Sequence, residues 1–271
     1  MRLKAIICLP FLLVCVNLYS QVKTLQAIKI SQAPKIDGNL DDAAWINVTP
    51  ASNFIQNFPT YGKEASTKTE VKLVYDNNAI YVGAYLYDDP KLIRTQLTAR
   101  DGEQRQDVDY FSVFFDTYKD LQNGFQFTVT TANVQSDARL TPNQETDFDE
   151  YGDKTWEAVW ESKVSIKEDG WVVEMRIPYI SLRFAKKDLQ DWGLQFLRFT
   201  RRTNERDFWN PINPQINGFV NQFGVYAGLK DIKPPLRLRF SPYISGGYRR
   251  SPEAGEFTDT WLRNGGMDVK Y

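Results

Sequence analysis

Residues 156–184, WEAVWESKVSIKEDGWVVEMRIPYISLRF, decide the fold. The second half of this stretch alternates with the two-residue period of a β-strand. One face carries Trp171, Val173, Met175 and Ile177, and the other carries Val172, Glu174 and Arg176. Asp169-Gly170 offers the positive-φ residue that a tight turn needs, so the stretch predicts two strands folded back as a hairpin. Pro178 ends the second strand because proline has no N–H for a ladder hydrogen bond.

Short alternating segments of the same kind recur along the chain and are separated by turn residues. The predicted strands are 27–30, 69–75, 79–87, 107–116, 125–131, 191–202 and 223–229. The predicted loops are 53–62, 133–154 and 203–222. One short helix, capped by Asp41, is expected to place Trp45 on the core. Six to eight short strands without a sustained helix predict an all-β fold, an antiparallel β-sandwich.

Composition excludes several classes of function. The 271 residues include no histidine, which removes the commonest general base and the commonest transition-metal ligand. Ser-His-Asp, Cys-His and histidine-zinc chemistry are therefore not available. The formal net charge of −1 lacks the basic excess of a nucleic-acid-binding surface, so no nucleic-acid partner is expected.

The first 20 residues have the pattern of a secretory signal peptide. A basic start at Arg2 and Lys4 precedes an apolar run, residues 5–16, and cleavage is expected after Ser20. The alternatives are a membrane anchor, for which the run is shorter than the roughly 20 residues of a spanning helix, and lipid attachment at Cys15. Both cysteines, Cys8 and Cys15, lie in this segment, so an exported mature chain without a disulfide is predicted.

The character of the sequence changes after residue 232. Lys233-Pro234-Pro235 reads as a linker, and residues 236–243 and 264–271 alternate between aromatic and polar side chains like strands. The alternating pattern continues to Tyr271, which we interpret as a cut end. The expected organisation is a signal peptide (1–20), a sandwich (21–232), and a linker with further strands (233–271).

Two separated runs of residues resemble a known family. The first is Ile36-Asp37-Gly38, Leu40-Asp41 and Trp45, and the second is Gly170-Trp171, Glu174 and Ile177-Pro178. Together they resemble the family-9 carbohydrate-binding module over about residues 30–230. The whole chain also resembles exported proteins of Gram-negative bacteria in which such a module precedes an outer-membrane β-barrel of unknown function. That resemblance implies that residues 233–271 begin a barrel, and that the protein lies in the outer membrane or the periplasm, or at the cell surface.

The resemblance implies non-catalytic binding of a polysaccharide or oligosaccharide, with no cofactor required. Aromatic rings would stack on the sugar and polar side chains would bond its hydroxyl groups. The candidate rings are Trp156, Trp160 and Trp209, with Arg201 and Asn204 as hydrogen-bonding residues. Each of these tryptophans could instead belong to the core, to which we assign Trp45 and Trp171.

Structural calcium is a second ligand that the resemblance implies. Asp88, Asp107 and Asp109, and the acidic loop 147–153, offer carboxylate oxygens at short spacing. Solvated acidic turns are the alternative interpretation of these residues.

Two other classes of function stay open from the sequence. The sandwich could serve contacts with its own barrel or with an envelope partner and have no sugar site. It could also be a glycoside hydrolase, which needs two carboxylates about 5 to 9.5 Å apart, and Glu157, Glu161 and Glu174 lie on or beside the aromatic hairpin.

Overall fold

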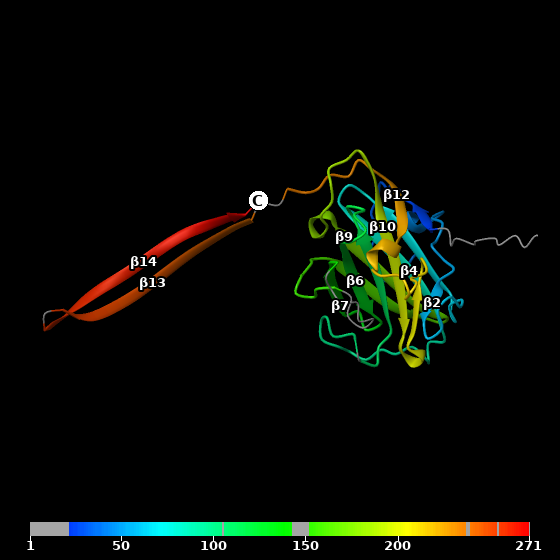
Figure 1. The fold of residues 1–271 in the computed structure, drawn as a ribbon, viewed down its shortest axis with the longest axis horizontal. Coiled ribbons are helices and arrows are strands. Elements are labelled where there is room, and N and C mark those ends of the chain that lie inside the picture. Colours follow the sequence, from blue (N-terminus) through cyan, green and yellow to red (C-terminus); the bar gives the residue numbers. More distant parts are fainter. Residues whose placement is uncertain (1–21, 105, 143–151, 237–238, 254, 271) are drawn as a thin grey trace, which may run out of the picture.

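The computed structural model describes residues 22–104, 106–142, 152–236, 239–253 and 255–270. Within them the chain is all-β and forms two sheets that pack face to face (Figure 1). The predicted β-sandwich is therefore confirmed. The signal segment and the acidic positions 147–150 lie outside the described residues. No helix in the described part is both long and apolar enough to cross a membrane.

The larger sheet has eight strands. They are β1 (Thr24–Gln26), β2 (Ile55–Phe58), β5 (Tyr110–Asp116), β6 (Gly124–Thr130), β7 (Gln135–Leu140), β10 (Leu189–Thr200), β11 (Glu205–Phe208) and β12 (Gly224–Lys230). The main path runs β1-β12-β10-β5-β6-β7, and β11 bridges β10 to β2. All pairs are antiparallel except β1 with β12.

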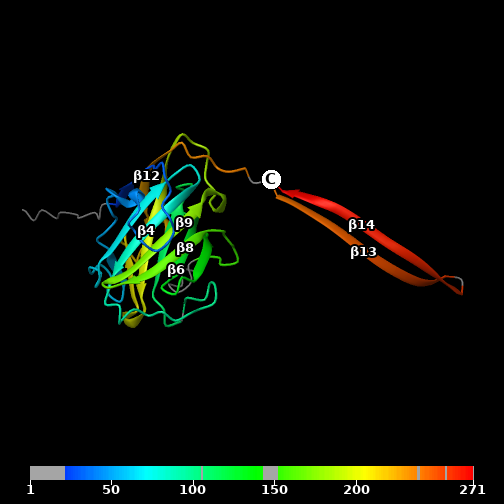
Figure 2. The ribbon, with the colours of Figure 1, turned by 180° about the vertical axis from the view of Figure 1, so that it is seen from behind.

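The smaller sheet has the order β3-β4-β9-β8 (Figure 2). Its strands are β3 (Thr69–Tyr75), β4 (Ala79–Tyr87), β8 (Glu161–Lys167) and β9 (Gly170–Pro178). β8 and β9 form the predicted hairpin, with Lys167 paired to Gly170. Gly170 has a φ of 155°, and a Cβ there would lie 2.2 Å from the Leu86 carbonyl oxygen of β4. Glycine is required here because the hairpin end passes directly against the next strand.

The core lies between the two sheets. Every second residue of β4 and β9 points into it, and Leu86, Trp171 and Met175 are fully buried there. The larger sheet contributes aromatic residues such as Trp192 and Phe196. Burial of these rings is the main source of stability in a chain without described disulfides.

Short 3₁₀ helices connect some of the strands. They are η1 (Ala43–Trp45), η2 (Tyr179–Ser181), η3 (Arg201–Thr203) and η4 (Val220–Gln222). The predicted helix near Asp41 is η1, which follows Asp42 instead and buries Trp45 completely.

Three predicted loops contain strands. β2 lies in 53–62, β7 in 133–154 and β11 in 203–222. These strands are four to six residues long and polar, so their sequences lack the apolar alternation that marks a strand. The predicted strand at Trp156 begins only at Glu161.

A separate two-stranded ribbon follows the sandwich. β13 (Arg239–Glu253) and β14 (Glu256–Lys270) pair antiparallel along their whole length. The ribbon extends away from the sandwich (Figure 1). Residues 249–252 lie within β13, which continues to Glu253 and pairs there with Glu256 of β14.

Candidate functional site

The three predicted tryptophans face the interior of the sandwich. Trp160 and Trp209 are 5% and 3% exposed and belong to the core. Trp209 packs against Phe196, with ring centroids 5.6 Å apart. Trp156 is half-buried, and its ring lies against Phe125 and Phe127 of β6. None of the three forms a free stacking platform on the surface.

Arg201 and Asn204 lie beside each other but apart from Trp209. The Arg201 guanidinium donates to Asn204 Oδ1 over 3.3 Å, on the exposed turn around η3. Asn204 has a φ of 51°, the left-handed conformation that ends η3. All four residues of β11 lie between Asn204 and Trp209, so the predicted constellation does not assemble.

The three aspartates proposed for calcium do not converge on one point. The Asp88 carboxylate accepts hydrogen bonds from Arg198 and Arg202 at 2.9 and 2.8 Å. Asp109 accepts from the backbone N–H groups of Arg94 and Arg201, and Asp107 is exposed. Arginines and amides thus occupy oxygens that a cation would need. Among the described residues, no group of three or more metal-ligating side chains could hold an ion.

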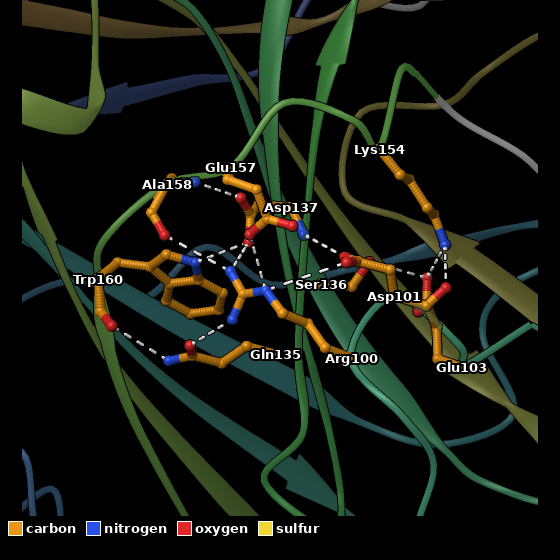
Figure 3. Close-up of polar contacts among 10 residues, drawn as sticks. All are labelled: Arg100, Asp101, Glu103, Gln135, Ser136, Asp137, Lys154, Glu157, Ala158 and Trp160. Carbon is orange, nitrogen blue, oxygen red and sulfur yellow. Dashed lines mark hydrogen bonds and ion pairs between the residues drawn. The ribbon is translucent and has the colours of Figure 1, made fainter. Parts of the chain in front are cut away.

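A polar cluster at the edge strand β7 contains the hydrogen-bonding partner of Trp160 (Figure 3). Asp137 is buried and accepts from Ala158 N at 2.6 Å, Trp160 Nε1 at 3.3 Å and the Arg100 guanidinium. Burial raises the pKa of Asp137, and these three donors oppose the shift. Asp137 therefore ties the segment before β8 to the larger sheet.

The loop that carries Arg100 wraps around β7. Arg100 reaches Asp137 and also donates to Glu157 Oε2 over 3.1 Å. Three residues later, the Glu103 carboxylate accepts from Ser136 Oγ at 3.3 Å and from Lys154 at 2.8 Å. Because neighbouring strand residues point to opposite faces, Arg100 contacts the inward side of β7 and Glu103 the outward side (Figure 3).

Glu103 lies at one end of a row of polar side chains on the outward face of the larger sheet. Ser112, Thr128 and Ser136 are cross-strand neighbours on β5, β6 and β7. Ser112 Oγ and Thr128 Oγ1 are 2.7 Å apart, and Gln126 Nε2 donates to Thr128 Oγ1 over 2.9 Å. We call Ser112, Gln126, Thr128, Ser136 and Glu103 the outward polar row. Their exposed fractions are 4% or less.

Two acceptors of the outward polar row lack a donor. Within the described part of the chain, Gln126 Oε1 and Glu103 Oε2 are buried without a hydrogen-bond partner. An unpaired buried acceptor costs about 1–3 kcal/mol. The row is bordered by the aromatic side chains of Phe114, Phe219 and Phe223, which pack edge to face or tilted at 4.9 to 5.9 Å. Hydroxyl-rich ligands supply the donors that such acceptors require. The three phenylalanines belong to a core cluster of their own and are buried.

The two sequence runs that resembled a family meet in space. Glu174 Oε2 accepts from the backbone N–H groups of Asp37, Gly38 and Asn39 at 3.0, 2.7 and 3.3 Å. Its Oε1 accepts from Trp45 Nε1 at 3.0 Å. The carboxylate of β9 thus fixes the N-terminal segment on the smaller sheet, so it is a structural anchor.

Comparison with family models gives a match over residues 36–219 to the carbohydrate family 9 binding domain-like family. The chain belongs to this family. Two solved structures of a family-9 carbohydrate-binding module from Caldicellulosiruptor kristjanssonii are similar to it. The complex with cellotriose is 21% identical with a TM-score of 0.54, covering 76% of this chain and 93% of that one. The complex with glucose is 20% identical with a TM-score of 0.55, covering 79% and 100%.

A structure from Bacteroides uniformis, described as a candidate carbohydrate-binding protein, is similar too. It is 13% identical with a TM-score of 0.59, covering 76% of this chain and 99% of that one. At these identities the likenesses establish a common fold. Comparison with curated protein sequences gave no match.

The outward polar row was not predicted from the sequence. Gln126, Thr128 and Ser112 stand at alternate positions of two predicted strands, and such positions are usually solvent-facing. The signal in the sequence is the set of glutamine and hydroxyl side chains at these alternate positions. They form one cross-strand row only when the two strands are paired in register. That register could not be deduced from the sequence.

Proposed function

We propose that the chain binds carbohydrate without catalysis, and that the outward polar row is its sugar site. The observation that carries this proposal is the pair of unpartnered buried acceptors, Gln126 Oε1 and Glu103 Oε2, in a member of this family. Sugar hydroxyl groups would donate to both oxygens. The similar structures with cellotriose and glucose suggest the first ligands to try.

Access to the row depends on the residues that lie over it. Ser136 is 2% exposed, and Glu103, held by Lys154, lies on it. Because every residue of the row is buried, a sugar reaches it only after a local opening of the residues that cover it. This opening has an energetic cost, so we expect weak binding.

The proposal is tested by calorimetric titration of the chain with glucose and cellotriose. Gln126→Met keeps the length of the side chain and removes both its acceptor and its donors. We expect it to weaken binding by about tenfold or more, because donors of the sugar lose their acceptor. Gln122→Met is the matched control, since Gln122 is exposed in the loop before β6. Equal affinities for both variants and the parent chain would refute the outward polar row as the site.

We further propose that the protein is exported and attached to the outer membrane through the β13–β14 ribbon, as part of a β-barrel with further strands beyond residue 271. Cross-strand pairs place Phe240 with Val269, Ile244 with Gly265, and Tyr248 with Trp261 on one face. The opposite face is mainly polar, with Ser241 paired to Asp268 and Ser245 to Asn264, and it also carries Tyr243 and Leu262. Apolar-out and polar-in alternation is the signature of strands in such barrels.

The length and borders of the apolar face support this attachment. Phe240 to Tyr248 is nine residues, close to the 9–11 of a spanning strand. The rings of Tyr248 and Trp261 lie at one border with their centroids 5.1 Å apart, and aromatic residues are enriched at membrane interfaces. Arg263, opposite Gly246, interrupts the face, and its long side chain can extend toward the border. A sandwich that serves partner contacts remains the alternative if no sugar binds.

A further inference from the structure

A groove on the opposite side of the sandwich has the features of a second binding site. It lies on the outward face of the smaller sheet, beside the segment that Glu174 anchors, and has a volume of about 380 Å³. Its lining combines two tyrosines with polar and charged side chains and one valine. The residues include Tyr85, Tyr87, Asn39, Asp41, Glu70, Lys72, Lys167 and Val172. Ligand sites for small molecules span about 300–1,000 Å³, so this groove is large enough for a small ligand. We call it the tyrosine groove.

The groove exists because the N-terminal segment covers only half of the sheet face. On β4, Tyr81, Gly83, Tyr85 and Tyr87 all point outward. Leu40 and Trp45 cover Gly83, where a Cβ would lie 2.6 Å from Leu40 Cδ2. Tyr81 is buried beneath this segment, whereas Tyr85 and Tyr87 beyond it are half-exposed. The covering segment therefore forms one wall and the two tyrosines the other.

The two rings are fixed in position before any ligand binds. Their centroids are 4.6 Å apart and their planes differ by 31°. Tyr85 Oη donates to Asp169 over 2.5 Å, and Tyr87 Oη donates to Glu70 over 3.1 Å. Lys68 Nζ lies 4.7 Å from the centre of the Tyr87 ring. A prepositioned ring loses little conformational entropy on binding, which favours affinity for a flat apolar surface.

The charges around the rings select a neutral ligand. Asp41 and Glu70 line the groove together with Lys72 and Lys167. The two further charges beside the rings, Lys68 and Asp169, are also opposite in sign. Burial, and secondly the hydrogen bond to Asp169, raises the pKa of Tyr85 to about 12, so its hydroxyl stays neutral. Lys167 Nζ reaches Asn39 Oδ1 at 2.6 Å, so amide, ammonium and carboxylate groups surround the aromatic pair. This set offers donors and acceptors to hydroxyl groups without a net field.

We propose that the tyrosine groove is a second carbohydrate site, for a neutral oligosaccharide that stacks on Tyr85 and Tyr87. Asn39, Lys72 and Glu70 would bond its hydroxyl groups. The outward polar row lies on the other sheet, so the two sites face opposite sides of the sandwich. One chain could then hold two glycan strands, which raises its avidity for a polysaccharide without new contacts. The groove site does not depend on the outward polar row.

The test is a calorimetric titration of the full chain with cellotriose and other neutral trisaccharides, together with an acidic trisaccharide. We expect two binding events with the neutral sugars. The double variant Tyr85→Leu/Tyr87→Leu should lose one event, with the remaining site weakened by less than about twofold. Tyr61→Leu is the matched control, because Tyr61 is exposed in a turn away from the groove. Gln126→Met should remove the other event.

A second variant separates stacking from a loss of folding. Tyr85→Phe keeps the ring and removes the hydroxyl, so it should retain the groove event while unfolding at nearly the temperature of the parent chain. Unchanged titrations for the double leucine variant would overturn the groove and leave the outward polar row intact. The groove proposal would also be overturned if the groove bound only the acidic trisaccharide, or if it bound none of the sugars. A parent chain that shows the groove event but no event sensitive to Gln126→Met would instead count against the proposed primary site.

Discussion

At the scale of single residues, the sandwich contains a pair of buried acidic side chains on one short strand. Asp207 and Glu205 are 0% and 4% exposed and lie next but one to each other on β11. Burial, reinforced by the neighbouring Glu205 carboxylate, raises the pKa of Asp207 to about 8. Burial also acts on Glu205, but hydrogen bonds from the Ser66 amide and hydroxyl, both 2.7 Å, outweigh it and hold the pKa of Glu205 below its usual range.

This pair should make the stability of the fold fall as pH rises. Folded Asp207 keeps its proton up to about pH 8, whereas the unfolded chain loses it near pH 4. Between these values the unfolded state binds fewer protons, so the free energy of unfolding decreases with pH. Asp207→Asn mimics the protonated acid. The free energy of unfolding of the variant, relative to that of the parent chain, should therefore rise by a few kcal/mol between pH 5 and pH 8.

Urea unfolding of both chains at pH 5 and pH 8 measures this difference. Asp188→Asn is the control, because Asp188 is exposed and should shift stability equally at both pH values. Other buried carboxyl groups with raised pKa values, such as Asp137 and Glu174, contribute equally to parent and variant. An Asp207→Asn chain whose stability changes with pH as steeply as the parent would show that Asp207 is ionised in the fold.

At the scale of elements, the β8–β9 hairpin depends on one glycine. A Cβ at Gly170 would lie 2.2 Å from Leu86 O and 2.9 Å from Tyr87 Cα, both backbone atoms that cannot rotate away. Gly170→Ala should therefore lower the free energy of unfolding by about 2–4 kcal/mol. Gly246→Ala, where a Cβ meets nothing within 4 Å, should change it little. Thermal unfolding of both variants decides the matter, and equal midpoints would contradict the proposed close approach.

The strands also differ in how well the sequence predicts them. Apolar alternation predicts β4, β9 and β10 because both the period and the buried face are visible in the residues. β7 and β11 are polar and short, and only their partners make them strands, so they were expected to be loops. Tryptophan was expected to mark the site, yet a ring such as Trp209 is as useful inside the core. Tyr85 and Tyr87 were predicted on a strand, but their exposure depends on where the N-terminal segment stops.

At the scale of the whole molecule, the sandwich and the ribbon bury their apolar side chains differently. Within the sandwich, both sheets turn their apolar faces toward each other. The ribbon instead leaves large side chains open, including Ile244 at 91% and Trp261 at 72% exposed. An isolated two-stranded ribbon is marginally stable in water, so an apolar environment or further strands must cover this face.

The membrane proposal predicts that lipid covers it. Of the seven tryptophans, the six in the sandwich are buried or half-buried, and Trp261 is the exposed one. Addition of phosphatidylcholine vesicles with brominated acyl chains should quench the fluorescence of Trp261, and Trp261→Phe should abolish that quenching.

Ile244→Asp, on the same face, should weaken vesicle binding by about tenfold or more because a carboxylate resists transfer into hydrocarbon. Ser245→Asp places the same charge on the polar face and should have little effect. If both aspartate variants bind vesicles alike, the apolar face of the ribbon does not contact lipid, and a protein partner becomes the better explanation for its exposure.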